Sequence, residues 1–89
     1  YSTAKAGLVG LARSLAREYG SFGITANVLS LGYFDTGLMD PIPEKLRAKM
    51  IADIPSRKLG DASNIAESIR YLIRADYVNG AVIPIDGGL

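Results

Sequence analysis

The chain begins with Tyr-Ser-Thr-Ala-Lys, which places the side chains best suited to proton transfer one helical turn apart. On a helix, Tyr1 and Lys5 project to the same face, so an ammonium group can lie near a phenol. A phenol with a pKa of ~10 is a poor base near neutral pH. A cation ~4 Å away stabilises the phenolate by ~1–4 kcal/mol at an effective dielectric of roughly 20–80. The pair could therefore give and take a proton, although taken by itself it is better explained as a solvated Tyr and Lys.

Composition narrows the remaining chemistry. The 89 residues include no Cys and no His, which excludes disulfides, thiolate nucleophiles, imidazole bases and the commonest transition-metal ligands, so we expect no metal site. Ten Lys and Arg balance nine Asp and Glu without a run of one sign, so nucleic acid is not an expected partner. No apolar stretch reaches the ~18 residues of a membrane span and no signal peptide is visible. We therefore expect no membrane partner and a cytoplasmic protein.

The amino-terminal segment has helical periodicity over Tyr1–Tyr19, and Gly20 is the expected left-handed stop. Two glycines, Gly7 and Gly10, lie on another side of this helix among small residues. Glycine within a helix costs about 1 kcal/mol relative to Ala, so close approach of another backbone there would compensate. The expected apolar stripe comprises Ala4, Leu8, Leu11, Ala12, Leu15, Ala16 and Tyr19.

Four further elements follow. Ile24–Ser30 is apolar on both faces and predicts a parallel strand covered on both sides. A Gly- and Pro-containing connection leads to a short helix over Pro43–Ile54. Asp61 is a suitable N-cap for a helix over Ala62–Ile73, and Ala81–Ile85 predicts a last strand. The stripe expected to be buried on the longer helix consists of Ile65, Ala66, Ile69, Leu72 and Ile73.

The order helix, strand, short helix, helix, strand is that of the closing βαβ half of an open parallel sheet, an α/β fold. Two parallel strands cannot cover both faces of each other and of the first helix. The chain taken alone is therefore expected to be an incomplete domain.

Several short motifs in order carry a resemblance to a known family. They are Tyr1-x-x-x-Lys5-Ala6, Gly23-Ile24 with Asn27, Gly32 with Thr36, Arg57-x-Leu59-Gly60 with Ile65-Ala66, and Asp86-Gly87-Gly88. The whole chain resembles the C-terminal portion of a short-chain dehydrogenase/reductase, closest to the 3-oxoacyl-(acyl carrier protein) reductases. The resemblance implies the C-terminal part of a Rossmann-type doubly wound parallel sheet. Residues 1–89 would be one segment of that domain, with the nucleotide-binding half absent.

The resemblance also implies residue roles. Tyr1 would be the general acid that protonates a carbonyl oxygen, and Lys5 would hold the nicotinamide ribose hydroxyls and lower the pKa of Tyr1. Gly32, the Phe34 backbone and Thr36 would line the nicotinamide, at the carboxyl end of a strand where open α/β sheets bind ligands.

The implied cofactor is NADP or NAD, with NADP preferred, and the favoured substrate is a 3-oxoacyl thioester, carrier-bound or free. A homotetramer is expected. A reductase of another small carbonyl such as a sugar, steroid or ketone, or a non-catalytic assembly subunit, are the alternatives. Two departures bear on these expectations: Leu31 replaces the family's usual Pro, and Phe22 replaces a basic residue common in carrier-specific members.

Other residues have simpler interpretations. Asn27 within an apolar strand is expected to be a hydrogen-bonded buried amide, and Leu46, Met50 and Ile54 are expected in the core. Tyr33 to Ile54, the long connection, would be a mobile substrate cover.

Overall fold

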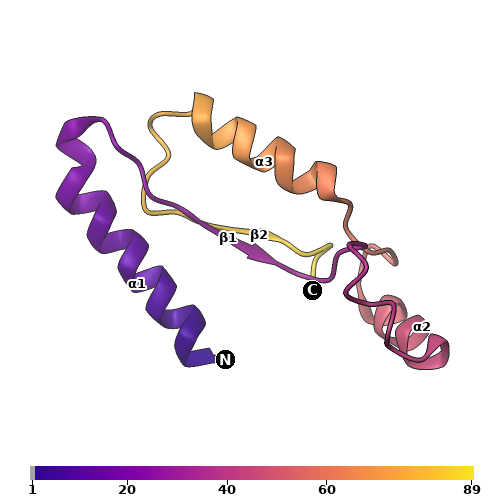
Figure 1. The fold of residues 1–89 in the computed structure, drawn as a ribbon. Coiled ribbons are helices and arrows are strands. Elements are labelled where there is room, and N and C mark those ends of the chain that lie inside the picture. Colours follow the sequence, from indigo (N-terminus) through magenta and orange to yellow (C-terminus); the bar gives the residue numbers. More distant parts are fainter. Residues whose placement is uncertain (1) are drawn as a thin grey trace. The chain divides into compact units, whose positions relative to one another are not determined.

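The computed structural model describes residues 2–89, so Tyr1 lies outside the described part of the chain. Its helices are α1 (Ser2–Tyr19), the 3-10 turn η1 (Gly20–Phe22), α2 (Glu44–Asp53) and α3 (Ala62–Arg74), and its strands are β1 (Val28–Leu31) and β2 (Val82–Ile85) (Figure 1). The expected α/β fold is confirmed.

The strands pair side by side in one register. The Val28 N–H donates to the Ala81 carbonyl and the Gly32 N–H donates to the Ile85 carbonyl, at 2.9 and 3.0 Å. Because donor and acceptor advance together along the two strands, the pair is parallel.

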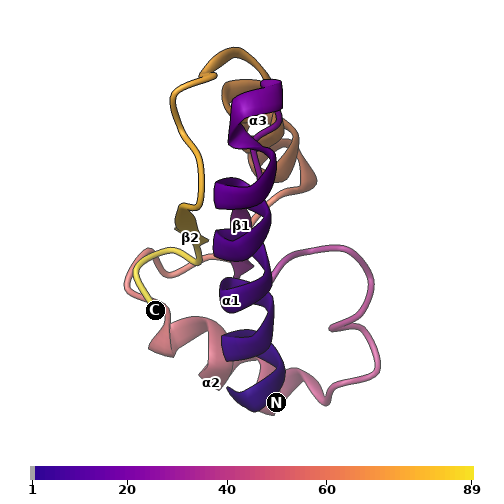
Figure 2. The same ribbon diagram turned by 90° about the vertical axis from the view of Figure 1, so that its left-hand side faces the viewer.

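Contacts divide the chain into two compact units. Unit 1 contains the described residues of Tyr1–Leu29 together with Ile69–Ile83, and unit 2 contains Ser30–Ser68 with Pro84–Leu89. In unit 1, α1 and the C-terminal half of α3 lie on opposite faces of that unit's part of the strand pair, as Figures 1 and 2 both show. Each unit therefore holds one half of both strands.

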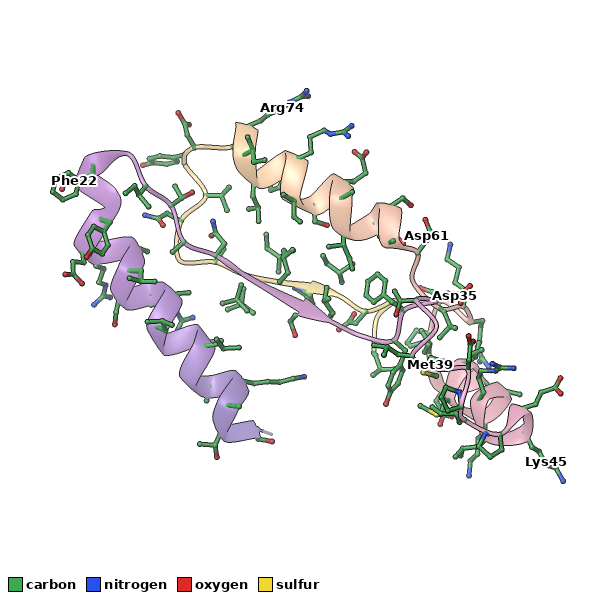
Figure 3. The ribbon with its side chains drawn as sticks, viewed as in Figure 1. Phe22, Asp35, Met39, Lys45, Asp61 and Arg74 are labelled. Atoms are coloured by element: carbon green, nitrogen blue, oxygen red, sulfur yellow. The ribbon has the colours of Figure 1, made fainter. Side chains whose placement is uncertain are left out.

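The two later helices have the expected bounds to within one residue because their end signals are local. α2 lies between the N-cap Pro43 and the C-cap Ile54. α3 begins after Asp61, whose carboxylate accepts a hydrogen bond from the Ser63 N–H at 3.1 Å and another from the Ser63 hydroxyl. The Asp61 N–H in turn donates to Asn64 Oδ1 at 2.9 Å. These bonds resemble a capping box, with Asn in the third helical position and with the Asp61 carboxylate bonded to the second. Asp61 is labelled at the start of the helix in Figure 3.

The end of α1 differs from the expectation. Gly20 does not provide the left-handed stop, because the chain continues through one 3-10 turn and Gly23 adopts the left-handed conformation with φ 77°. The Gly23 N–H donates to the Gly20 carbonyl at 3.0 Å. Phe22, labelled at this turn in Figure 3, has a 73% exposed side chain.

The first strand also begins later than expected, at Val28 instead of Ile24. The residues before it lie outside the strand. There the Ala26 N–H donates to Asn79 Oδ1 at 2.9 Å, and the Gly80 N–H donates to the Ala26 carbonyl at 2.8 Å. The regular pairing of the two strands starts at Val28, where the segment that begins at Ala81 lies alongside. The second strand begins one residue late, at Val82.

Within the described residues, the stripe of α3 that was expected to be buried is not buried, and most of the apolar stripe of α1 is exposed as well. In α1 only Ala12 and Ala16 are buried, whereas Leu8 is 57% exposed. In α3, Ile73 is 77% exposed. A Cβ at Gly7 or Gly10 would meet nothing within 4 Å. The apolar faces of α1 and α3 remain largely exposed because two strands offer too little surface to cover them.

None of the described helices combines the length and apolar character needed to cross a membrane.

Candidate functional site

The loop after β1 is fixed to the end of β2 at Gly32, in unit 2. A Cβ at Gly32 would lie 2.8 Å from both Cα and Cβ of Asp86, closer than such atoms approach in proteins. The Gly32 N–H donates to the Ile85 carbonyl at 3.0 Å. Glycine is therefore required at this position by close contact between the two backbones.

Two residues later the chain makes a parallel bridge between Phe34 and Gly60. The Asp35 N–H donates to the Gly60 carbonyl at 2.8 Å, and the Gly60 N–H donates to the Tyr33 carbonyl at 2.9 Å. The Phe34 side chain is only 8% exposed. The bridge fixes this part of the loop against the segment that leads into α3.

The N–H and C=O groups of Phe34 itself point to the side opposite to Gly60. In a β-ladder, successive residues point their N–H and C=O groups to alternate sides. Because the groups flanking Phe34 bond Gly60, the Phe34 N–H and C=O point away from Gly60. One donor and one acceptor on one residue match the two ends of a carboxamide group, so this backbone fits the expected partner of a nicotinamide.

Thr36 lies in the bend that follows and is exposed. The next residue, Gly37, has φ 90° and permits the chain to turn there. Unit 2 thus brings Gly32, Phe34 and Thr36 together on one five-residue loop after β1.

Lys5 belongs to unit 1, where it is exposed on the first turns of α1. Tyr1, its expected partner, lies outside the described residues. The structure therefore describes the loop residues in one unit and Lys5 in the other.

A second connection in unit 2 holds the end of the chain. The Ser56 N–H and hydroxyl both donate to the Gly87 carbonyl, at 3.0 and 2.8 Å. A Cβ on Gly87 would lie 2.7 Å from Cγ2 of Ile54, which is 2% exposed and is the most deeply buried large side chain described. The Asp86-Gly87-Gly88 motif is thus a packing surface for Ile54 and its neighbours. Of the three residues expected in the core on α2, Ile54 is buried, Met50 is half-buried and Leu46 is exposed.

Asn27 uses both ends of its amide, as expected, although the residue is half-buried instead of buried. Its Nδ2 donates to the Val78 carbonyl at 3.1 Å and its Oδ1 accepts from the Ala81 N–H at 2.9 Å. Asn79 has a comparable role that the sequence did not reveal: its Nδ2 donates to the Ala16 carbonyl at 3.2 Å. An Asn-Gly pair is a turn signal, and nothing local distinguishes one that also ties a turn to a helix.

Among the described residues, Asp61 has a pKa that its surroundings lower. The hydroxyl and then the N–H of Ser63 stabilise the carboxylate, so the pKa of Asp61 falls below its ordinary value of 3.8. The ionised Asp61 carboxylate therefore stabilises the first turn of α3.

A half-open cavity of about 290 Å³ lies in unit 1, and no expected site residue lines it. Its apolar wall comes from the stripe of α3 that was expected to be buried, and its polar lining includes Asn27 and Asp76. The apolar wall consists of Ile69, Leu72 and Ile73.

Comparison with known proteins places these features in a family. All of residues 1–89 match the family model described as Enoyl-(Acyl carrier protein) reductase. The chain is 42% identical over 91 residues to the 3-oxoacyl-[acyl-carrier-protein] reductase MabA of Mycobacterium avium, and 43% identical over 91 residues to the corresponding reductase FabG of Pseudomonas aeruginosa. Each alignment covers 100% of this chain.

Among solved structures, one described as a 2-deoxy-d-gluconate 3-dehydrogenase from Agrobacterium tumefaciens, with bound NADP, is 35% identical with a TM-score of 0.87. That match covers 99% of this chain and 37% of the other. The chain spans 36% of the M. avium protein and 37% of the P. aeruginosa protein. With a family match along its whole length and a backbone that superposes on a dehydrogenase, this chain belongs to the short-chain dehydrogenase/reductase family.

Proposed function

We propose that the protein is an NAD(P)-dependent oxidoreductase that reduces the ketone of a 3-oxoacyl thioester to a hydroxyl. The observation that carries this proposal is the identity of 42–43% to two 3-oxoacyl-[acyl-carrier-protein] reductases over the whole chain. In this proposal, residues 1–89 form the C-terminal segment of one Rossmann-fold domain.

The proposed cofactor is NADP or NAD, with NADP preferred because the solved dehydrogenase contains it. When bound, the cofactor supplies the hydride. The Phe34 N–H and C=O would hold the carboxamide, and their direction away from Gly60 supports this role. Gly32 and Thr36 would complete the lining of the same loop.

Tyr1 and Lys5 carry the proton chemistry of the proposal. Tyr1 donates its phenolic proton to the carbonyl oxygen of the substrate as negative charge develops there. In this proposal the ammonium of Lys5, four residues later in the sequence, stabilises the phenolate that is left. The same ammonium would bind the ribose hydroxyls.

A second candidate reaction has its own support. The solved dehydrogenase carries the name of a sugar acid, 2-deoxy-d-gluconate, in its description, and it matches this chain with a TM-score of 0.87. Phe22, exposed where carrier-specific members commonly have a basic residue, also favours a small free substrate over a carrier-bound one.

The decisive experiment measures oxidation of NADPH and NADH by the purified full-length protein with three substrates in parallel. These are a short 3-oxoacyl thioester, the matching enoyl thioester and a 3-keto sugar acid. The proposal expects the highest kcat/KM with the 3-oxoacyl thioester. Preference for the sugar acid would establish the second candidate, preference for the enoyl thioester would move the reaction to a carbon–carbon double bond, and no turnover would favour a non-catalytic subunit.

Assembly as a homotetramer is part of the proposal. The exposed apolar side chains of α1, with Leu8 57% and Leu11 55% exposed, support a partner surface on this helix. Light scattering on the full-length protein gives the mass directly. A monomeric mass would exclude the tetramer without bearing on the reaction.

A further inference from the structure

Arg57 has an unusual backbone conformation. Among the described residues other than glycine, it is the one with positive φ, at 59°. A side chain in this left-handed region is crowded by its own carbonyl group, so glycine or asparagine is the usual occupant. An arginine that remains here needs a compensating interaction.

The side chain provides one. Its NH1 donates to the Ala52 carbonyl at 2.9 Å, in the last turn of α2. Carbonyls at a helix C-terminus lack partners within the helix, and they form the negative end of its dipole. The neighbouring Ile51 carbonyl accepts a hydrogen bond from the Ile54 N–H at 3.1 Å, so a backbone group and a guanidinium each bond one carbonyl of this end.

Arg57 also stands between two fixed points of unit 2. On one side, Ser56 donates twice to the Gly87 carbonyl. On the other, Gly60 is bonded to the backbone on both sides of Phe34. The cover segment, residues 33–54, therefore begins in the expected cofactor loop and is followed by residues that are bonded to other parts of unit 2. Between those residues, Arg57 bonds the last turn of α2, the helix of the cover segment. Lys45 marks the opposite, N-terminal end of that helix in Figure 3.

We infer that Arg57 is a positioning residue that holds the C-terminal end of α2, and with it the cover segment, in the orientation that admits the acyl substrate. The inference rests on the proposed function for the identity of the substrate. Its structural part, the contact between Arg57 and Ala52, is independent of the reaction.

The test compares Arg57→Gly, Arg57→Lys and the control Lys58→Ala in the full-length protein. Glycine removes both the guanidinium and the backbone strain, lysine keeps a cationic donor, and the control removes the adjacent charge without touching the contact with Ala52. Measurements are kcat, KM for the thioester, the thermal midpoint, and hydrogen exchange of the amides in the last turn of α2.

For Arg57→Gly we expect exchange in that turn to be about tenfold faster and KM to rise about tenfold, which corresponds to one lost hydrogen bond from a charged donor. We expect kcat to change less than about twofold, and the thermal midpoint to stay level or rise because glycine relieves the strain. Lysine should restore much of the exchange protection and of KM, and the control should match the wild type.

Unchanged exchange in Arg57→Gly would overturn the inference, as would a fall in the thermal midpoint with KM unaltered, since that pattern belongs to a purely structural residue. A wild-type protein that fails to turn over the thioester would overturn the proposed function and the substrate part of the inference. Faster exchange in that case would still establish the contact that holds α2.

Discussion

The ring of Phe34 lies against the backbone of Gly60, so close that a Cβ at position 60 would stand 2.6 Å from Cε2 and 2.7 Å from Cδ2 of the ring. The same two residues form the parallel bridge that fixes the loop after β1. The Phe34 ring can therefore be buried at this place only because Gly60 has no side chain.

Replacing Gly60 by Ala should destabilise the full-length protein by about 1–3 kcal/mol, because a methyl group must displace a ring that is 8% exposed. Thermal or urea unfolding measures the loss. In a Phe34→Leu background the same substitution should cost less, because leucine has no ring over position 60. Equal costs in the two backgrounds would show that this contact does not require the glycine.

Replacing Asn27 by Ala should cost about 2–3 kcal/mol of unfolding free energy. Two hydrogen bonds are lost, and the Ala81 N–H and Val78 carbonyl lose their partner in a half-buried place. Asn27→Asp is the informative companion, since it keeps the acceptor for Ala81 but replaces the donor to Val78 with an oxygen. Stability in urea checks both, and a neutral Asn27→Ala would contradict the structural role of the amide.

Stability should fall at acid pH through Asp61. Hydrogen bonds from Ser63 lower the folded-state pKa below the ordinary 3.8, so the unfolded state binds the proton more readily. The contribution is complete above the unfolded pKa and is lost as pH falls through the folded pKa. Asp61→Asn, which can still cap the helix but does not titrate, should flatten this part of the profile when unfolding is followed from neutral pH to about pH 2. A profile with the same slope as the wild type would exclude Asp61 as the source.

Replacing Tyr1 by Phe in the full-length protein should lower kcat by about 10²–10⁴-fold, the usual contribution of a general acid. Binding of reduced nicotinamide, followed by its fluorescence, should be largely retained because the ring remains. Tyr71→Phe is the matched control: it removes a phenol from the surface of α3, where the side chain is 55% exposed, and should leave turnover unchanged. Undiminished turnover in Tyr1→Phe would refute the proton-donor role.

The sequence alone predicted the elements whose signals are local. Asp61 directly precedes α3 and Pro55 follows the end of α2 by two residues, and each acts on residues within one turn. The bounds of both helices were therefore predicted to within one residue. The loop residues Gly32, Phe34 and Thr36 came from resemblance, since nothing local gives a backbone amide a role in binding.

Tertiary structure decided what depends on distant partners. β1 begins at Val28 because pairing requires the chain from Ala81 beside it, although strand character in the sequence begins at Ile24. The left-handed backbone of Arg57, the amide bridge of Asn79 and the glycine under the Phe34 ring depend on residues far away in the chain or on a conformation that arginine rarely adopts. Periodicity records which face of a helix is apolar, but only the surfaces available in three dimensions determine whether that face is buried.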